Sequence, residues 1–111
     1  MIFSGILYFD DESGDDIHVK RLILSGDDVA FNGVATWNQN ERYEIDTRAH
    51  RAGEIFVSGE TCPKTGTTTG YPVVLSFSKL EKIEDVLFIE GSWLVSGQAY
   101  AFSGELEPIS L

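Results

Sequence analysis

The segment from Val86 to Leu106 constrains the fold of this chain more than any other, because it reads as two consecutive strands that pair with each other. If Ser96 and Gly97 form the turn, one face of this β-hairpin is almost wholly apolar. A glycine then twice lies opposite a large apolar side chain, which can cover the bare backbone of the partner strand. The opposed pairs are Val95 with Gln98, Trp93 with Tyr100, Gly91 with Phe102, Ile89 with Gly104 and Leu87 with Leu106.

A turn at Gly91 and Ser92 is the alternative for this hairpin. Its turn chemistry is better for a two-residue loop. It would, however, place Glu90 opposite Trp93 and Leu87 opposite Ser96. Because the quality of the opposed pairs outweighs the turn preference, the pattern predicts a hairpin that turns at Ser96.

Strand-like segments also make up the rest of the chain, at intervals of roughly a dozen residues. No helical periodicity separates them, and no shift in composition marks a linker. A helical turn fits only at Lys79–Asp85, and the mixed charges there fit a solvated loop equally well. The expected strands are Ile2–Phe9, Ile17–Leu24, Val29–Trp37, Arg42–His50, Glu54–Thr61, Tyr71–Lys79, Val86–Val95 and Gln98–Glu107.

The clearest alternation of apolar and charged residues lies in Arg42–His50, which predicts one dry and one solvated face. A three-residue loop of Arg51, Ala52 and Gly53 would set Ala49 opposite Ile55, Thr47 opposite Val57 and Ile45 opposite Gly59. Ile17–Leu24 carries apolar residues in both phases, so its register stays open. The residues expected on the dry face are Tyr43, Ile45, Thr47 and Ala49, together with Val29, Phe31, Gly33, Ala35 and Trp37.

Both ends of the chain carry the tripeptide Phe-Ser-Gly, at Phe3–Gly5 and at Phe102–Gly104. Glycine within a strand often marks a bend or bulge, which a sheet needs when it curls into a barrel. If the two ends of the sheet meet, these segments lie on neighbouring strands and no edge is left exposed. The sequence therefore predicts an all-β fold, a small antiparallel up-and-down barrel of about eight strands, with a two-sheet β-sandwich as the alternative. The expected barrel is similar to lipocalins and avidins in architecture only, and this resemblance implies no function.

Composition suits a single barrel domain over residues 1–111, large enough for a core that needs no disulfide. The formal net charge of −10 opposes binding to nucleic acid or to anionic membranes and permits a basic protein partner. Cys62 is the one cysteine, so no internal disulfide forms. No apolar run reaches membrane-spanning length and Met1–Phe9 lacks the basic start of a signal peptide, so a cytoplasmic protein is expected.

Two segments resemble ligand-binding motifs without matching them. Asp10–Asp16 is strongly acidic but lacks the alternate ligand spacing and the glycine and glutamate positions of a calcium loop. Thr61–Gly70 is rich in hydroxyl groups, but Pro63 stands where a phosphate-binding loop requires glycine before the lysine. We expect a solvated turn at the first segment and a surface loop at the second, with no metal and no cofactor.

No catalytic constellation emerges from the sequence. Cys62, His18 and His50 could supply a thiol nucleophile and a base, but the expected topology sets Cys62 and His50 at opposite ends of the barrel. Pairs of carboxylates are common in so acidic a chain and carry little information about acid–base chemistry. The protein is therefore expected to be non-enzymatic.

The aromatic side chains give the alternative functional hypothesis, a barrel that binds a small ligand. Under the expected registers several of them point into the barrel, which either fills its interior or holds one small ligand. Those near one rim could line a pocket for a small apolar or aromatic ligand. The candidate ligand-binding residues are Trp37, Tyr43, Trp93 and Tyr100.

Charge and outward apolar residues give the main functional hypothesis, a non-enzymatic acidic module that binds a basic partner protein and inhibits or neutralises it. Phe88 and Leu94 fall on the outer face of the last hairpin, where an apolar pair can mark a contact surface. The acidic segment near the start of the chain would attract a basic partner. The candidate partner-binding residues are Phe88, Leu94, Asp10, Asp11, Glu12, Asp15 and Asp16.

Overall fold

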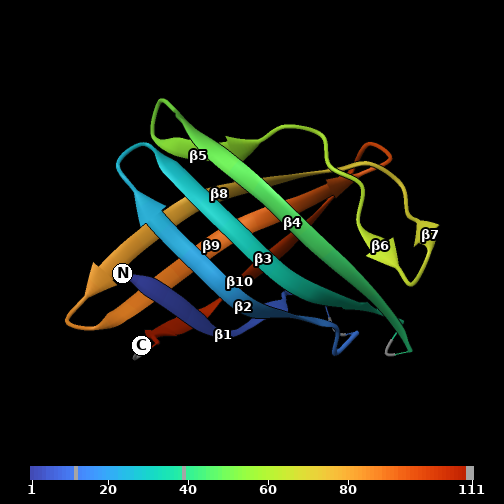
Figure 1. Cartoon of the computed structure of the whole chain (residues 1–111), viewed down its shortest axis with the longest axis horizontal. Helices are drawn as coiled ribbons and strands as arrows, with labels where there is room; N and C mark the ends of the chain where they lie inside the picture. Colours follow the sequence, from blue (N-terminus) through green and yellow to red (C-terminus); the bar gives the residue numbers. More distant parts are fainter. Residues whose placement is uncertain (12, 39, 110–111) are drawn as a thin grey trace.

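The computed structural model describes residues 1–11, 13–38 and 40–109, and within them it contains strands and no helix. The strands build a closed antiparallel barrel of eight, to which two short strands are added (Figure 1). The expected antiparallel barrel is thereby confirmed. The barrel strands are β1 (Ile2–Phe9), β2 (Asp16–Ser25), β3 (Asp28–Trp37), β4 (Glu41–Ala52), β5 (Ile55–Ser58), β8 (Val73–Ile83), β9 (Val86–Val95) and β10 (Gln98–Pro108), and the added strands are β6 (Lys64–Thr65) and β7 (Thr68–Thr69).

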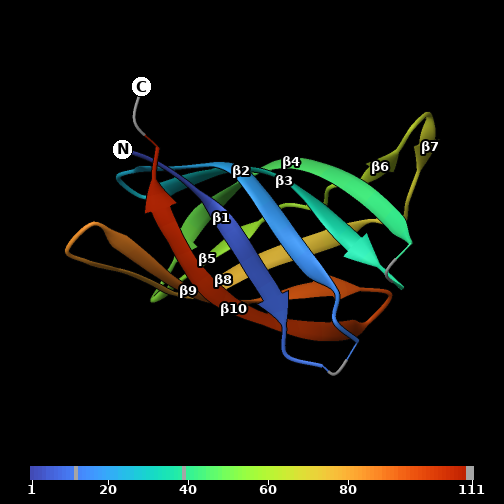
Figure 2. The same cartoon turned by 90° about the horizontal axis from the view of Figure 1, so that it is seen from below.

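The barrel closes where β1 pairs with β10, so that the two Phe-Ser-Gly segments lie on neighbouring strands (Figure 2). Gly5 lies opposite Leu106 and Leu7 opposite Gly104. Each barrel strand also pairs with the next one along the chain, in an up-and-down order. A two-sheet sandwich is not formed, because the β3–β4 and β1–β10 pairings leave no gap between two separate sheets.

The last hairpin has the register that its apolar face predicts, with Trp93 opposite Tyr100 and Gly91 opposite Phe102. Ser96 and Gly97 form its turn with φ values of 51° and 77°. Positive φ at both turn positions is the geometry that matches the twist of two-residue hairpins. Side-chain pairing therefore determines the turn, and Ser96 accepts a conformation that costs a non-glycine residue some strain.

Aromatic rings fill the middle of the barrel. Phe77 lies 5.8 Å from Phe31 and 6.0 Å from Phe102 between ring centroids, and Phe102 lies 6.2 Å from Phe9. Phe31, Phe77 and Phe102 are each at most 1% exposed. The two pairs that involve Phe102 meet edge to face, and contacts of this geometry add to the free energy that burial itself provides. Phe9 and Phe77, which the sequence did not single out, are central to this core.

Gly91 allows the tightest contact in the barrel wall. A β-carbon at this position would lie 2.3 Å from the carbonyl oxygen of Ser76 and 2.9 Å from the ring of Phe102. Both distances are shorter than any real carbon contact. Glycine is therefore required here, so that the Phe102 ring can lie directly against the backbone of β9.

A β-bulge explains why β2 shows apolar residues in both phases. Val19 lies opposite Gly33 and Arg21 opposite Asn32, so Lys20 is the extra residue between them. Ile17 and Val19 point inward before the bulge, and Leu22 points inward after it. The bulge resets the alternation and leaves Lys20 and Arg21 both exposed.

The predicted register between β4 and β5 is wrong. Ala49 lies opposite Ser58, not Ile55, and Ala52 lies opposite Ile55 across a two-residue turn at Gly53 and Glu54. The register shift of three residues, an odd number, turns Phe56 and Ser58 inward and leaves Ile55 38% exposed. Burial of the larger Phe56 ring favours this register, and the Ser58 hydroxyl accepts a hydrogen bond from the Leu75 amide at 2.9 Å across the short β5–β8 contact.

The segment Lys79–Asp85 is neither a helical turn nor a loop, because β8 continues through it to Ile83. A second bulge, at Ser78, moves Leu80 onto the inner side opposite Ile89. The ladder with β9 then runs on until a two-residue turn at Glu84 and Asp85. Pairing with the long β9 strand therefore determines the structure of this segment, although its mixed charges would also fit a solvated loop.

The two ends of the barrel differ in what they carry (Figure 1). One end holds both chain termini and the turns after β2, β4 and β8. The other end, called the distal end below, holds the connections after β1, β3, β5 and β9. The longest of these, residues 59–72, contains β6 and β7 and is not the plain surface loop that the sequence suggests, since β6 pairs with β4.

Replacing Gly91 by alanine tests the close contact in the barrel wall. We expect Gly91→Ala to lower the free energy of unfolding by about 2–3 kcal/mol, near the upper end of the usual cost of overpacking. Urea unfolding followed by tryptophan fluorescence measures this change. Gly59→Ala is the matched control, because a β-carbon at Gly59 would meet no atom within 4 Å. Equal effects of the two substitutions would show that the contact does not limit stability.

Candidate functional site

A pocket of about 280 Å³ opens at the distal end of the barrel, and we call it the rim pocket. Its walls come from the end of β3, the start of β4, the segment 59–72 and the β9–β10 hairpin. Five of its described lining residues are aromatic. The lining residues are Trp37, Tyr43, Pro63, Tyr71, Trp93, Val95, Ser96, Gln98 and Tyr100.

Strand alternation explains why these side chains meet. In β3, β4, β9 and β10 the inward positions that build the core continue to the rim, where the barrel interior opens. Trp93 is only 4% exposed and forms the deep side, while Trp37, Tyr43 and Tyr100 are half-buried. The rim pocket is thus the open upper end of the same layer of side chains that forms the core.

Ring contacts connect the pocket to the core. Trp37 and Tyr100 meet edge to face with centroids 5.1 Å apart. Phe9 lies below, 6.4 Å from Trp37 and 6.2 Å from Trp93. Because both tryptophans are packed against Phe9, their rings are positioned before any ligand arrives.

The segment 59–72 closes one side of the pocket. The amide of Gly70 donates a hydrogen bond to the carbonyl oxygen of Pro63 at 2.7 Å, which ties the segment into a compact loop. A β-carbon at Gly70 would lie 3.4 Å from the ring of Tyr43, so the loop rests directly on that ring. Tyr71, 76% exposed, stands at the mouth of the pocket.

Two phenol groups at the pocket donate hydrogen bonds, one to a lining residue and one to a residue outside the lining. The Tyr100 hydroxyl donates to the side-chain oxygen of Gln98 at 3.0 Å, and the Tyr43 hydroxyl donates to the carboxylate of Glu41. The hydrogen bond to Glu41, with desolvation and the nearby negative charge as smaller causes, raises the pKa of Tyr43 above its ordinary value of 10.0. Tyr43 is therefore a neutral ring near pH 7. None of the described lining residues carries a charge.

The titration of Tyr43 tests the contact with Glu41. We expect Glu41→Gln to lower the pKa of Tyr43 towards 10.0, because the charged acceptor that favours the protonated phenol is lost. At pH values below the ordinary pKa of tyrosine, the hydrogen bond stabilises the fold. This contribution disappears as the pH rises through the raised pKa of Tyr43. The tyrosine ring carbon signals in NMR measure the change, and Glu54→Gln is the control of equal charge.

All four aromatic residues that the sequence suggested for ligand binding, Trp37, Tyr43, Trp93 and Tyr100, lie together in the rim pocket. Sequence reasoning missed Tyr71 and Pro63. Both lie in the segment 59–72, whose path cannot be read from alternation because only two short strands interrupt it. The high content of hydroxyl-bearing and small residues in this segment was the one local signal that it forms part of a site.

The proposed apolar pair Phe88 and Leu94 does not form one patch. They lie six residues apart on the outer face of β9, about 20 Å along an extended strand. Phe88 is half-buried with Glu81 and Glu105 as its cross-strand neighbours. Leu94 is 40% exposed beside Ala99 and Val74.

The acidic segment after β1 divides into exposed and inward-facing carboxylates. Asp10 and Asp11 are exposed, and Glu12 lies outside the described residues. Asp15 is only 5% exposed, and its carboxylate accepts a hydrogen bond from the amide of Asn38 at 3.1 Å. Asp16 is half-buried and accepts from the Thr36 hydroxyl at 3.1 Å. Asp15 and Asp16 thus hold neighbouring connections at the distal end of the barrel together.

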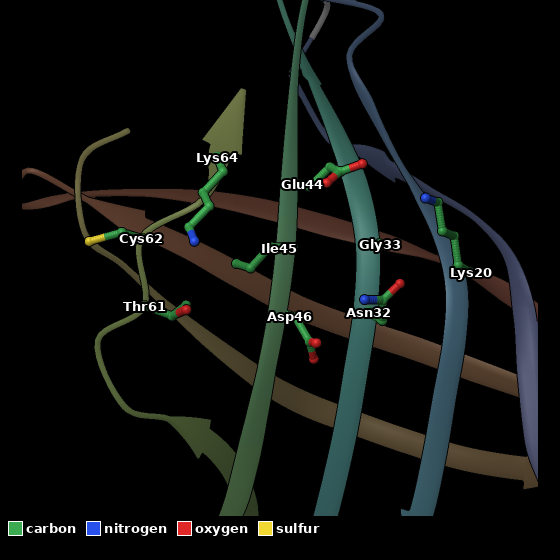
Figure 3. A pocket seen from close by; sticks show the side chains of 9 residues that line it. All are labelled: Lys20, Asn32, Gly33, Glu44, Ile45, Asp46, Thr61, Cys62 and Lys64. Carbon is green, nitrogen blue, oxygen red and sulfur yellow. The ribbon is translucent and has the colours of Figure 1, made fainter. Parts of the chain in front are cut away.

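A second hollow, of about 370 Å³, lies on the outer surface of the barrel between β2, β3, β4 and the start of the segment 59–72 (Figure 3). Lys20 and Lys64 border it from opposite sides, and Glu44 and Asp46 lie between them on β4. Cys62 is exposed at its edge. In Figure 3, β4 runs across the middle of this hollow.

The histidines and Cys62 do not come together. His18 lies 3.5 Å from Asp16, and His50 forms a hydrogen bond with Asp28 near the opposite end of the barrel. Over residues 1–11, 13–38 and 40–109, no three histidine, cysteine or acidic side chains are grouped as they would be to hold a metal ion. The same residues include no helix that is long and apolar enough to cross a membrane.

Comparison of the sequence with protein-family models gives no match, and comparison with curated proteins gives none either. The class of site is therefore interpreted from its geometry and chemistry: an uncharged aromatic pocket in the mouth of a small closed β-barrel.

Proposed function

We propose that this protein is a non-enzymatic binding protein that takes up a small apolar or aromatic ligand in its rim pocket. The observation that supports this proposal is the convergence of five aromatic side chains from separate segments on one opening: Trp37, Tyr43, Tyr71, Trp93 and Tyr100. Aromatic side chains with a few polar groups are the usual lining of small-molecule sites, which often lie in the mouths of β-barrels.

The size of the pocket limits the ligand. A cavity of about 150 Å³ is sufficient for benzene. The rim pocket, at about 280 Å³, therefore suits a molecule of one or two rings with a small substituent. Ser96 and Gln98 at the mouth offer a hydroxyl and an amide to a polar substituent.

The charge around the pocket limits the ligand further. The described lining contains no lysine or arginine, and the protein has a formal net charge of −10. The faces of aromatic rings also carry partial negative charge. A neutral ligand should therefore bind more tightly than an anion of the same shape.

Binding can be followed through the two tryptophan indole N–H signals in NMR, since both tryptophans line the pocket. We expect 2-naphthylmethanol to shift both signals saturably and 2-naphthoate to bind more weakly. Tyr71→Ala should weaken binding about three- to tenfold, because one ring contact contributes about 0.5–1.5 kcal/mol. Unchanged indole signals at saturating probe would contradict the proposal.

The control for this experiment is Tyr8→Ala. Tyr8 is 56% exposed on the outer face of β1, and Tyr71 is 76% exposed, so both substitutions remove an exposed tyrosine ring. Neither should impair folding, which urea unfolding checks. Only Tyr71→Ala should change affinity for 2-naphthylmethanol. Equal effects of the two variants would place the probe outside the rim pocket.

A second candidate function is the binding of a basic protein on the outer face of β8, β9 and β10. The observation that favours it is the position of Phe88 directly between two carboxylates, Glu81 and Glu105, on the neighbouring strands. A half-buried ring flanked by negative charge suits an exposed lysine or arginine side chain of a partner.

A lysine- and arginine-rich peptide serves as the probe for this surface. We expect it to shift the backbone amide signals around Phe88, with an affinity that falls as salt is added. Phe88→Ala should reduce the shifts, and Tyr8→Ala should not. Shifts spread over all acidic residues, unaffected by Phe88→Ala, would exclude a defined site.

A further inference from the structure

A groove of about 840 Å³ crosses the outer faces of β1 to β4 and ends beneath the β6–β7 hairpin, and we call it the outer groove. The hairpin stands out from the barrel wall and forms one side of this concave corner (Figures 1 and 2). The lining residues are Ser4, Gly5, Ile6, His18, Val19, Lys20, Val34, Thr36, Arg42, Glu44, Lys64, Thr65 and Gly66.

The charge of the outer groove is opposite to that of the protein. The chain has eight lysines and arginines against 18 acidic residues, and three of the eight, Lys20, Arg42 and Lys64, line this one groove. Glu44 is the one carboxylate among its described lining residues. Within the described part of the chain, none of the three cations forms an ion pair.

The first of these cations, Lys20, lies at the bulge in β2. Because Lys20 is the extra residue between Val19 and Arg21, it stands out of the regular ladder with β3. It lies on the same exposed side as His18, two residues before it. Regular alternation with the buried Ile17 and Val19 already turns Lys20 outward, towards the groove.

Pairing between β4 and β6 brings the other two cations to the groove. Lys64 lies directly opposite Glu44, and Arg42 lies two residues before Glu44, on the same face of β4. In Figure 3, Lys20 rises from β2 on one side of Glu44 and Lys64 from β6 on the other. The cations therefore come from three different strands around a concave surface.

We propose that the outer groove binds a small polyanion, a molecule that carries several phosphate or carboxylate groups. Three cations on separate strands can contact several anionic groups at once, and Ser4 and Thr65 supply hydroxyl donors beside them. A long anionic polymer is disfavoured, because beyond the groove it would pass over the acidic surface of a protein with net charge −10. This site is separate from the rim pocket and does not depend on the ligand proposed there.

The test uses inorganic tripolyphosphate and citrate as probes, each titrated into the full chain at low salt and followed by backbone amide NMR signals. We expect saturable shifts around Lys20, Arg42 and Lys64 with at least one probe, and the stronger probe identifies phosphate or carboxylate as the preferred group. Lys64→Gln should weaken binding about two- to fivefold, as expected for one exposed ion pair. No saturable shift with either probe would overturn the proposal.

Variants of equal net charge separate a defined site from general electrostatics. Lys82→Gln removes one exposed cation far from the groove and should leave binding unchanged. Glu44→Gln should tighten binding, and Glu90→Gln on β9 should not. If Lys82→Gln weakens binding as much as Lys64→Gln does, the groove is not the site. Tyr71→Ala should leave tripolyphosphate binding unchanged, so failure at the rim pocket and failure here remain distinguishable.

Discussion

The absence of a side chain at Gly91 is the constraint on which the rest of the barrel depends. It lets the Phe102 ring lie against β9, and Phe102 in turn contacts both Phe77 and Phe9. Phe9 carries the contact onward to the two tryptophans of the rim pocket. A single close approach between backbone and ring is thus connected, through a continuous series of aromatic contacts, to the geometry of the candidate ligand site.

The bulges have a comparable role on the outside of the barrel. A strand with strict alternation would turn Arg21 into the core, which would bury a charge without a partner. The bulge at Lys20 avoids this, so that Arg21 faces outward beside Lys20, and Lys20 lines the outer groove. The segment 59–72 then serves both sites, since Pro63 lines the rim pocket and its neighbour Lys64 lines the outer groove. Adjacent residues of one segment thereby take part in an uncharged site and a cationic one.

Much of the fold and part of the site could be predicted because alternation is a local property. The register of the last hairpin followed from matching its apolar faces, and the closure between β1 and β10 followed from the Phe-Ser-Gly segments at both ends of the sheet. The same matching brought four aromatic residues to one rim. It did not reveal the β4–β5 register, where a two-residue turn at Gly53 and Glu54 replaces the expected three-residue loop and Phe56 becomes buried. Nor did it place Tyr71, since the segment 59–72 is positioned by contacts with Tyr43 and β4.

The sequence alone determined an all-β antiparallel barrel, the faces of its long strands and the aromatic character of one rim, because period-two patterns record which face of a strand is buried. Only the tertiary structure decided which residues complete the two sites. Lys20, Arg42 and Lys64 are far apart in the chain and meet because β2, β3, β4 and β6 lie side by side in one curved sheet. Proximity of this kind arises from the pairing of strands, which leaves no periodic signal at the residues it brings together.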